Sequence, residues 1–131
     1  MGNAGAKGWI VVAALSAATA IAVGAFAAHG LDLGTEAGRK ARDWLQTGSQ
    51  YEMVHALAIL AVASLSGRLN GRLATTAQVL FLLGSILFPG ALYSLAFNGP
   101  RWFGAVAPIC GLAFIVGWLL LAVAALRRPT P

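Results

Sequence analysis

The chain has 131 residues, of which 59% are hydrophobic and 10% are charged, and its mean hydropathy is +0.78. A soluble domain of this length lacks the polar surface to cover so apolar a chain, so the composition excludes a soluble enzyme and a disordered tail. The net charge is +5, but the basic residues flank apolar runs, as membrane orientation requires, so we expect no nucleic-acid partner. We expect a single integral membrane domain over residues 1–131.

Four apolar runs predict an all-α fold, a bundle of four transmembrane helices. The expected helices cover residues about 9–28, about 48–66, about 74–97 and about 102–126. The first, third and fourth runs carry no formal charge and are long enough to cross about 30 Å of hydrocarbon. The second run is shorter and carries Glu52 and His55 near its start. A secretory signal peptide is the alternative for the first run, but the apolar stretch is too long for one.

Between the first two runs, residues about 35–47 alternate with helical period and predict a short amphipathic interfacial helix. Its apolar face carries Trp44, a residue typical of the membrane–water interface. Its other face holds two pairs of opposite charge at i,i+4 spacing, Glu36 with Lys40 and Arg39 with Asp43. The expected interfacial anchors are Trp9, Trp44 and Trp102.

The apolar runs also carry packing signals. Small residues recur at three- and four-residue spacing along the first run and predict close helix packing. They are Ala13, Ala17, Ala20, Gly24 and Ala28. Pro89 and Pro108 each remove a backbone donor, so we expect kinks in the third and fourth helices. The single cysteine, Cys110, excludes an intrachain disulfide.

The loop charges predict an orientation. With both termini inside, five basic residues lie on the inner side and four on the outer side, where all four acids also fall. The inner residues are Lys7, Arg68, Arg72, Arg127 and Arg128, and the outer ones are Arg39, Lys40, Arg42 and Arg101. Because cationic loops are retained in the cytoplasm, we expect cytoplasmic termini. The high alanine and arginine content suggests a bacterial cytoplasmic membrane.

The candidate polar cluster consists of His29, Glu52 and His55, which we expect on the same membrane side. Ionisable groups within a membrane are candidates for handling protons or ions. Alternatively, Glu52 lies at the headgroup level beside Tyr51 and pairs with Arg39 or Arg42, and the histidines cap or bridge helices. Haem held by the two histidines is a third interpretation. One Glu-x-x-His pair is too few ligands for a di-iron site, so we expect no metal and no cofactor.

Four ordered motifs span most of the chain. They are Gly24–Leu31, Trp44 with Tyr51-Glu52 and His55–Leu57, Leu87–Tyr93, and Ala107–Gly111 with Gly117-Trp118. In this order and spacing they resemble the domain-of-unknown-function 423 family, whose animal members are called transmembrane protein 256. The resemblance covers about Trp9–Leu126 and implies a small multi-pass membrane protein with four helices. The family's name records that no mechanism is established, so the resemblance implies none.

The chain departs from the family pattern at three places. Ala27 and Glu52 stand where relatives typically have Gly and Gln, and Pro89–Ala91 replaces a Ser-Gly-Ser. The loss of two hydroxyls argues against a polar ligand at that part of the third helix. Both histidines match the pattern, which favours a shared role for His29 and His55.

We expect a non-catalytic binding or scaffold protein for lipid or a membrane-protein partner, with residues 35–48 as the contact surface and a homodimer as one form of partner. No nucleophile elbow, phosphate loop or catalytic triad is present, so we do not expect an enzyme. The alternative is a small proton- or ion-coupled transporter or channel that uses Glu52, His55 and His29.

Overall fold

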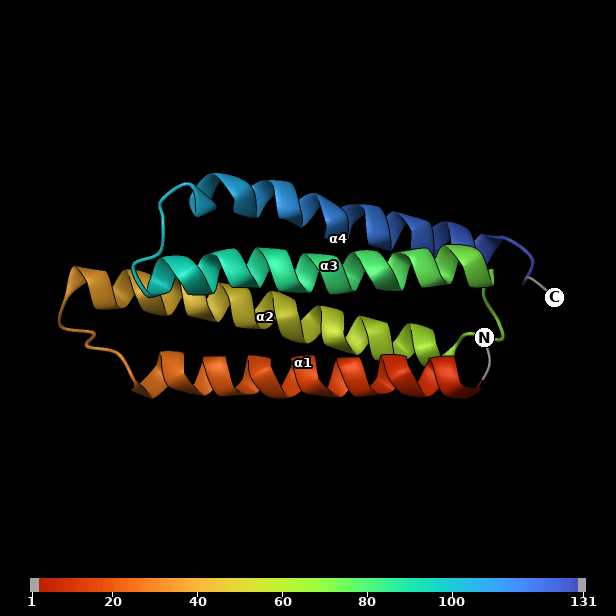
Figure 1. Cartoon of the computed structure of the whole chain (residues 1–131), viewed down its shortest axis with the longest axis horizontal. Helices are drawn as coiled ribbons and strands as arrows, with labels where there is room; N and C mark the ends of the chain where they lie inside the picture. The colour runs from red at the N-terminus through yellow and green to blue at the C-terminus, as the bar shows by residue number, and fades with distance from the viewer. Residues whose placement is uncertain (1–2, 130–131) are drawn as a thin grey trace.

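The computed structural model describes residues 3–129, and this part of the chain forms four helices. They are α1 (Asn3–His29), α2 (Glu36–Ser64), α3 (Gly71–Ala96) and α4 (Phe103–Leu126). The helices lie side by side in chain order with antiparallel neighbours, so α1 begins and α4 ends at the same end of the bundle (Figure 1). The prediction of an all-α fold is confirmed.

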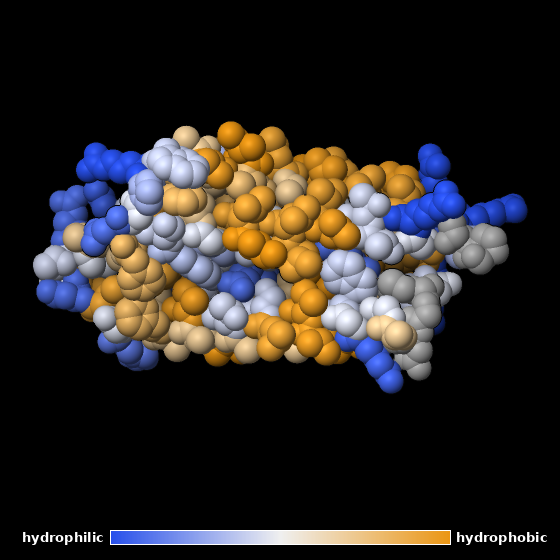
Figure 2. Space-filling view, viewed as in Figure 1, coloured by the Kyte–Doolittle hydropathy of each residue, from blue (hydrophilic) through white to orange (hydrophobic). Residues whose placement is uncertain are grey.

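The prediction of four transmembrane helices is wrong for the second helix. Within the described residues, three helices are long and apolar enough to cross a membrane, namely α1, α3 and α4. In α2 the first two turns are highly charged. Glu52 and His55 then interrupt the apolar sequence of the remainder, although the helix itself is continuous. The uncharged stretch Met53–Ser64 covers about 18 Å of helix, too little for about 30 Å of hydrocarbon. Apolar surface gathers over the middle of the bundle, and hydrophilic side chains gather at both ends (Figure 2).

The separate interfacial helix over residues 35–47 is also wrong, because α2 continues through Thr47 and Gly48 without a break. The start of the helix is close to the predicted one, since the Thr35 hydroxyl accepts a hydrogen bond of 3.0 Å from the backbone N–H of Gly38. Gly48 is typical of a helix end in the sequence, but here it allows a close helix contact. A Cβ at this position would lie 2.6 Å from the Tyr93 ring.

The apolar face expected for this segment exists, but it packs into the bundle. Leu45 is buried, and Trp44 packs against a cluster of apolar side chains from α3 and α4. The ion pair between Glu36 and Lys40 is confirmed at 3.1 Å. The second predicted pair is absent among the described residues, because Asp43 pairs instead with its neighbour Arg42 at 3.2 Å.

The small residues of α1 pack against α2. The buried positions are Ala13, Ala20 and Ala27, which recur every seven residues and form one seam along the helix. Gly24 lies beside this seam, and a Cβ there would meet the Ser49 hydroxyl at 3.5 Å. Ala28 is exposed, so the seam ends at Ala27, one residue before the end of the predicted stripe.

Glycines also bring α3 and α4 together. A Cβ on Gly84 would lie 2.5 Å from the Phe114 ring, and a Cβ on Gly117 would lie 2.7 Å from the Phe81 ring. On each helix, one glycine therefore leaves room for a phenylalanine ring of the other helix. This reciprocal packing gives close backbone approach without hydrophobic burial as its driving force.

The two prolines lie inside continuous helices, Pro89 in α3 and Pro108 in α4. Neither interrupts its helix, and the kinks stay a prediction. Of the expected interfacial anchors, Trp9 and Trp44 pack partly against core clusters. Trp102 is 61% exposed at the start of α4.

Candidate functional site

Glu52 is a buried carboxylate in the middle of the bundle, with 7% of its surface exposed. It follows the start of α2 by 16 residues, which is about 24 Å of helix. Its Oε1 accepts a hydrogen bond of 3.2 Å from the Ser16 hydroxyl of α1. Its Oε2 accepts one of 2.7 Å from the Tyr93 hydroxyl of α3. One side chain therefore ties α2 to both of its neighbours.

This geometry corrects the expectation that Glu52 lies at the headgroup level and pairs with Arg39 or Arg42. Because α2 begins at Glu36, residue 52 lies more than four turns inside the helix. Arg39 donates instead to the Leu33 carbonyl at 3.0 Å, and Arg42 pairs with an adjacent aspartate. Within residues 3–129 no cation lies within ion-pair distance of Glu52.

His55 is 3% exposed and uses both ring nitrogens. Its Nδ1 lies 2.7 Å from the backbone carbonyl of Tyr51, one turn earlier in α2. Its Nε2 lies 3.1 Å from the indole Nε1 of Trp118 in α4. Because an indole N–H only donates, Nε2 is the acceptor and Nδ1 carries the proton, which makes the ring a neutral Nδ1–H tautomer.

His55 also lies at the centre of a group of rings that we call the aromatic layer. Its ring stacks on Phe114 with centroids 3.5 Å apart and an interplanar angle of 14°. The Phe81 ring is tilted against it at 5.4 Å. The full aromatic layer consists of Tyr51, His55, Phe81, Phe88, Phe114 and Trp118. This layer connects α2 to α3 and α4.

The three residues of the predicted polar cluster do not converge. His29 is exposed at the end of α1, and it follows Ser16 by 13 residues, or about 20 Å of helix. Glu52 and His55 share α2, but they bind different partners on different helices. The haem hypothesis fails on the same geometry, because neither ring nitrogen of His55 is free. In the described part of the chain, no three His, Cys, Asp or Glu residues lie close enough to hold a metal ion.

Sequence reasoning missed the partners of these two residues. Ser16 is a lone hydroxyl in the small-residue seam of α1, and Tyr93 and Trp118 lie in otherwise apolar runs. Tyrosine and tryptophan in a membrane helix carry a polar group that requires a partner, and this signal would have pointed to Tyr93 and Trp118. The sequence did not show which of the few acceptors each would reach.

Two cavities open beside these residues on the flank of the bundle. One of about 450 Å³ lies between α1 and α3 and is lined by Phe26, Tyr93 and Phe97 with smaller apolar side chains. The other, of about 340 Å³, lies beside His55 and Trp118. Glu52 lines neither cavity. The Glu52 carboxylate is therefore enclosed by protein, whereas His55 borders a cavity whose lining is mostly apolar.

Three spanning candidates, an apolar middle and an internal polar network define a small membrane protein with several spans. The profile of the family described as "Protein of unknown function (DUF423)" matches residues 23–111. The chain belongs to this family, as its motifs indicated. No solved structure matches it.

Curated relatives agree with this assignment. The chain is 42% identical over 114 residues to a UPF0382 membrane protein of Haemophilus influenzae, covering 87% of this chain and 90% of the relative. It is 40% identical over 125 residues to the UPF0382 membrane protein YwdK of Bacillus subtilis, covering 92% and 98%. It is 37% identical over 118 residues to the UPF0382 inner membrane protein YgdD of Escherichia coli K12, covering 90% and 88%. The protein is thus a membrane protein of an uncharacterised family.

Proposed function

We propose that this protein is a non-catalytic scaffold that binds phospholipid in a bacterial cytoplasmic membrane, with both termini on the cytoplasmic side. One observation carries the proposal: in the buried pair Glu52 and His55, both carboxylate oxygens and both ring nitrogens already have hydrogen-bond partners within the protein. Glu52 uses its two oxygens on α1 and α3, and His55 uses its two nitrogens on α2 and α4. A catalytic acid, base or metal ligand needs a free atom that faces a substrate.

The surface supports lipid as the ligand. The cavity of about 450 Å³ between α1 and α3 is apolar along its length and opens to the flank of the bundle, where acyl chains surround a membrane protein. The segment over residues 35–48, which we expected to be the contact surface, has its apolar face inside the bundle. It therefore offers a partner only its exposed charged face, around Glu36 and Lys40.

The test is to extract the protein from native membrane without detergent, using an amphipathic copolymer, and to identify the bound molecules by mass spectrometry. We expect one phospholipid class to be enriched over the surrounding membrane, at a fixed ratio to protein. A bulk lipid composition together with a stoichiometric second protein, or with a second copy of this chain, would replace the lipid proposal. A bulk composition with no partner of any kind would overturn both.

A groove variant makes this test specific. Ala22 lines the apolar cavity, whereas Ala18, one turn earlier on α1, is exposed and lines neither flank cavity. Ala22→Phe fills the groove and is expected to lower the amount of retained lipid, and Ala18→Phe is the matched control. Equal retention in both variants would show that lipid binds elsewhere.

A second candidate, proton or ion handling, is favoured by one feature of Glu52: it is a buried carboxylate without a cation beside it in the described part of the chain. In proteoliposomes with a pH-sensitive dye, this function predicts a flux that disappears in Glu52→Gln. Glu36→Gln is the control, because it makes the same change on an exposed residue. No flux in the wild-type protein would eliminate this candidate.

A further inference from the structure

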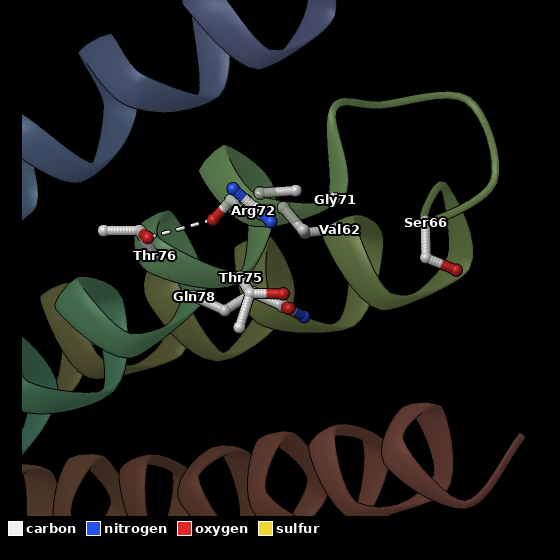
Figure 3. A pocket seen from close by; sticks show the side chains of 8 residues that line it. Val62, Ser66, Gly71, Arg72, Thr75, Thr76 and Gln78 are labelled. Carbon is white, nitrogen blue, oxygen red and sulfur yellow. Dashed lines mark hydrogen bonds between the residues drawn. The ribbon is translucent and has the colours of Figure 1, made fainter. Parts of the chain in front are cut away.

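The end of the bundle where α2 finishes and α3 begins contains a cavity of about 470 Å³ (Figure 3). Val62 and Ser66 line it from the end of α2 and the following turn. Arg72, Thr75 and Gln78 line it from α3. These three residues are spaced three apart, so they lie on one face of the helix, and Figure 3 shows Thr75 and Gln78 extending toward the same side of α3.

Gln78 is a buried residue of this cavity with one unpaired polar atom. Its side chain is 0% exposed, and its Nε2 donates a hydrogen bond of 3.1 Å to the backbone carbonyl of Ile59. This bond orients the carboxamide and leaves Oε1 without a hydrogen-bond donor among the described residues. Buried polar atoms are nearly always hydrogen-bonded, and an unpaired one is unfavourable. The Oε1 of Gln78 therefore indicates a donor that a bound molecule would supply.

The other polar groups of the cavity suit an anion. Arg72 has no acidic partner within residues 3–129, and the side-chain hydroxyls of Ser66 and Thr75 make no hydrogen bond with these residues. Thr76 differs, because its hydroxyl donates to the Arg72 carbonyl at 2.9 Å. One guanidinium and two hydroxyls are thus available as donors. They lie near the N-terminus of α3, where the helix dipole also favours negative charge.

The positive charge at this end of the bundle also favours binding of an anion. The end of α4 lies against the α2–α3 turn, because the backbone N–H of Asn70 donates to the Ala124 carbonyl at 3.0 Å. The basic residues gathered at this end are Lys7, Arg68, Arg72, Arg127 and Arg128. None of the four acidic side chains, all of which the structure describes, lies here: three follow α1 or begin α2, and Glu52 is in the middle.

We propose that this cavity binds the headgroup of an anionic phospholipid that also carries a free hydroxyl, as phosphatidylglycerol does. The phosphate accepts hydrogen bonds from Arg72, Ser66 and Thr75, and the headgroup hydroxyl donates to Oε1 of Gln78. A lipid suits the site better than a free phosphate, because the cavity lies at the end of α3, a helix apolar and long enough to span the membrane. The inference rests on the proposed lipid-binding function and names the lipid class and its site.

The experiment is native mass spectrometry of the full chain in detergent, titrated with phosphatidylglycerol, phosphatidylcholine and phosphatidylmethanol. Phosphatidylmethanol is anionic but has no headgroup hydroxyl, so it isolates the contribution of Gln78. We expect phosphatidylglycerol to bind most tightly. Arg72→Gln should weaken its binding about fivefold, the effect of one cation near a lipid surface. Arg68→Gln, which removes a charge outside the cavity, is the matched control and should change binding much less.

Gln78→Met tests whether Gln78 selects a phospholipid that has a headgroup hydroxyl. It should abolish the preference for phosphatidylglycerol over phosphatidylmethanol, which we expect to be about fivefold in the wild-type protein. If circular dichroism shows that this variant does not fold, Thr75→Val tests the same cavity by weakening the binding of both anionic lipids. An unchanged preference in folded Gln78→Met would overturn the assigned role of Oε1.

The remaining outcomes separate the two proposals. Equal weakening by Arg68→Gln and Arg72→Gln would show diffuse attraction to the basic end and overturn the site. Competition by soluble glycerol 3-phosphate at equal concentration would identify free phosphate as the ligand and overturn the lipid. If another lipid class is enriched from native membrane and phosphatidylglycerol does not bind, this inference fails and the proposed function stands. If no lipid is retained in either experiment, both fail.

Discussion

Glu52 and His55 in the middle of the bundle differ from Gln78 at its basic end in how completely their polar atoms are hydrogen-bonded. In the middle, both oxygens of Glu52 and both ring nitrogens of His55 have partners within the protein. At the basic end, Gln78 is equally buried, but its Oε1 has no partner among residues 3–129. A satisfied polar group stabilises the fold, whereas an unsatisfied one beside a cavity indicates where a ligand supplies the missing hydrogen bond.

The difference has a simple geometric cause. Glu52 and His55 receive hydrogen bonds from hydroxyl and indole donors of α1, α3 and α4, because glycines in the middle of the bundle let the helices approach closely. Gln78 lines a cavity of about 470 Å³, and no described residue donates a hydrogen bond to its Oε1. Four variants test whether the middle is structural and the basic end is a binding site.

The largest effect is expected for Glu52→Ala. It removes two interhelical hydrogen bonds, leaves the hydroxyls of Ser16 and Tyr93 without their acceptor and opens a cavity, so it should lower the free energy of unfolding by about 3 kcal/mol. Denaturation with sodium dodecyl sulfate in mixed micelles, followed by circular dichroism, measures this. Glu36→Ala removes an exposed carboxylate and is the control. Similar losses in both variants would contradict a structural role for Glu52.

Gly48→Ala should lower the free energy of unfolding by about 2 kcal/mol, because the added methyl group overlaps the Tyr93 ring and displaces its hydroxyl from Glu52. Gly90→Ala is the matched control in α3, since a Cβ there meets nothing within 4 Å. The control should gain up to about 1 kcal/mol in helix propensity. If Gly48→Ala is stabilising to the same extent, α2 and α3 are not as close as the structure places them.

Trp118→Phe keeps an aromatic ring but removes the donor to His55, and it should lower the free energy of unfolding by about 1 kcal/mol. Trp102→Phe makes the same change at a residue that is 61% exposed, and it should change stability by less than about 0.5 kcal/mol. The same denaturation experiment compares the two. An equal effect would mean that the bond from Trp118 to His55 contributes nothing.

The smallest effect is expected for Gln78→Met in detergent without phospholipid. The variant loses one hydrogen bond to the Ile59 carbonyl but also loses an unpaired buried oxygen, so stability should change by less than about 0.5 kcal/mol. With phosphatidylglycerol present, the wild-type protein should gain more stability than the variant, because it binds this lipid more tightly. Thermal unfolding in the two conditions checks this. A large loss without lipid would place Gln78 with Glu52 as a structural residue.

Sequence patterns predicted much of the fold and less of the site. Hydropathy located α1, α3 and α4, and the spacing of Ala13 and Ala20 located the packing seam of α1. The boundary at Gly48 was wrong, because a glycine within a helix and a glycine at its end look alike until its neighbour, here Tyr93, is known. His29 was grouped with His55 because the second helix was expected to begin near residue 48. Since α2 begins at Glu36, His55 lies much deeper in the bundle than this expectation placed it.

The sequence by itself determined that this is an all-α membrane protein of the DUF423 family with a basic excess, because composition and motifs act locally and add along the chain. Only the tertiary structure decided that α2 is one continuous helix between α1 and α3, and which donors reach Glu52 and His55. It also decided that Gln78 Oε1 is left unpaired, within the part of the chain that the structure describes, beside Arg72. A hydrogen bond depends on distances of about 3 Å between helices that are far apart in sequence, and the register of helix packing sets those distances.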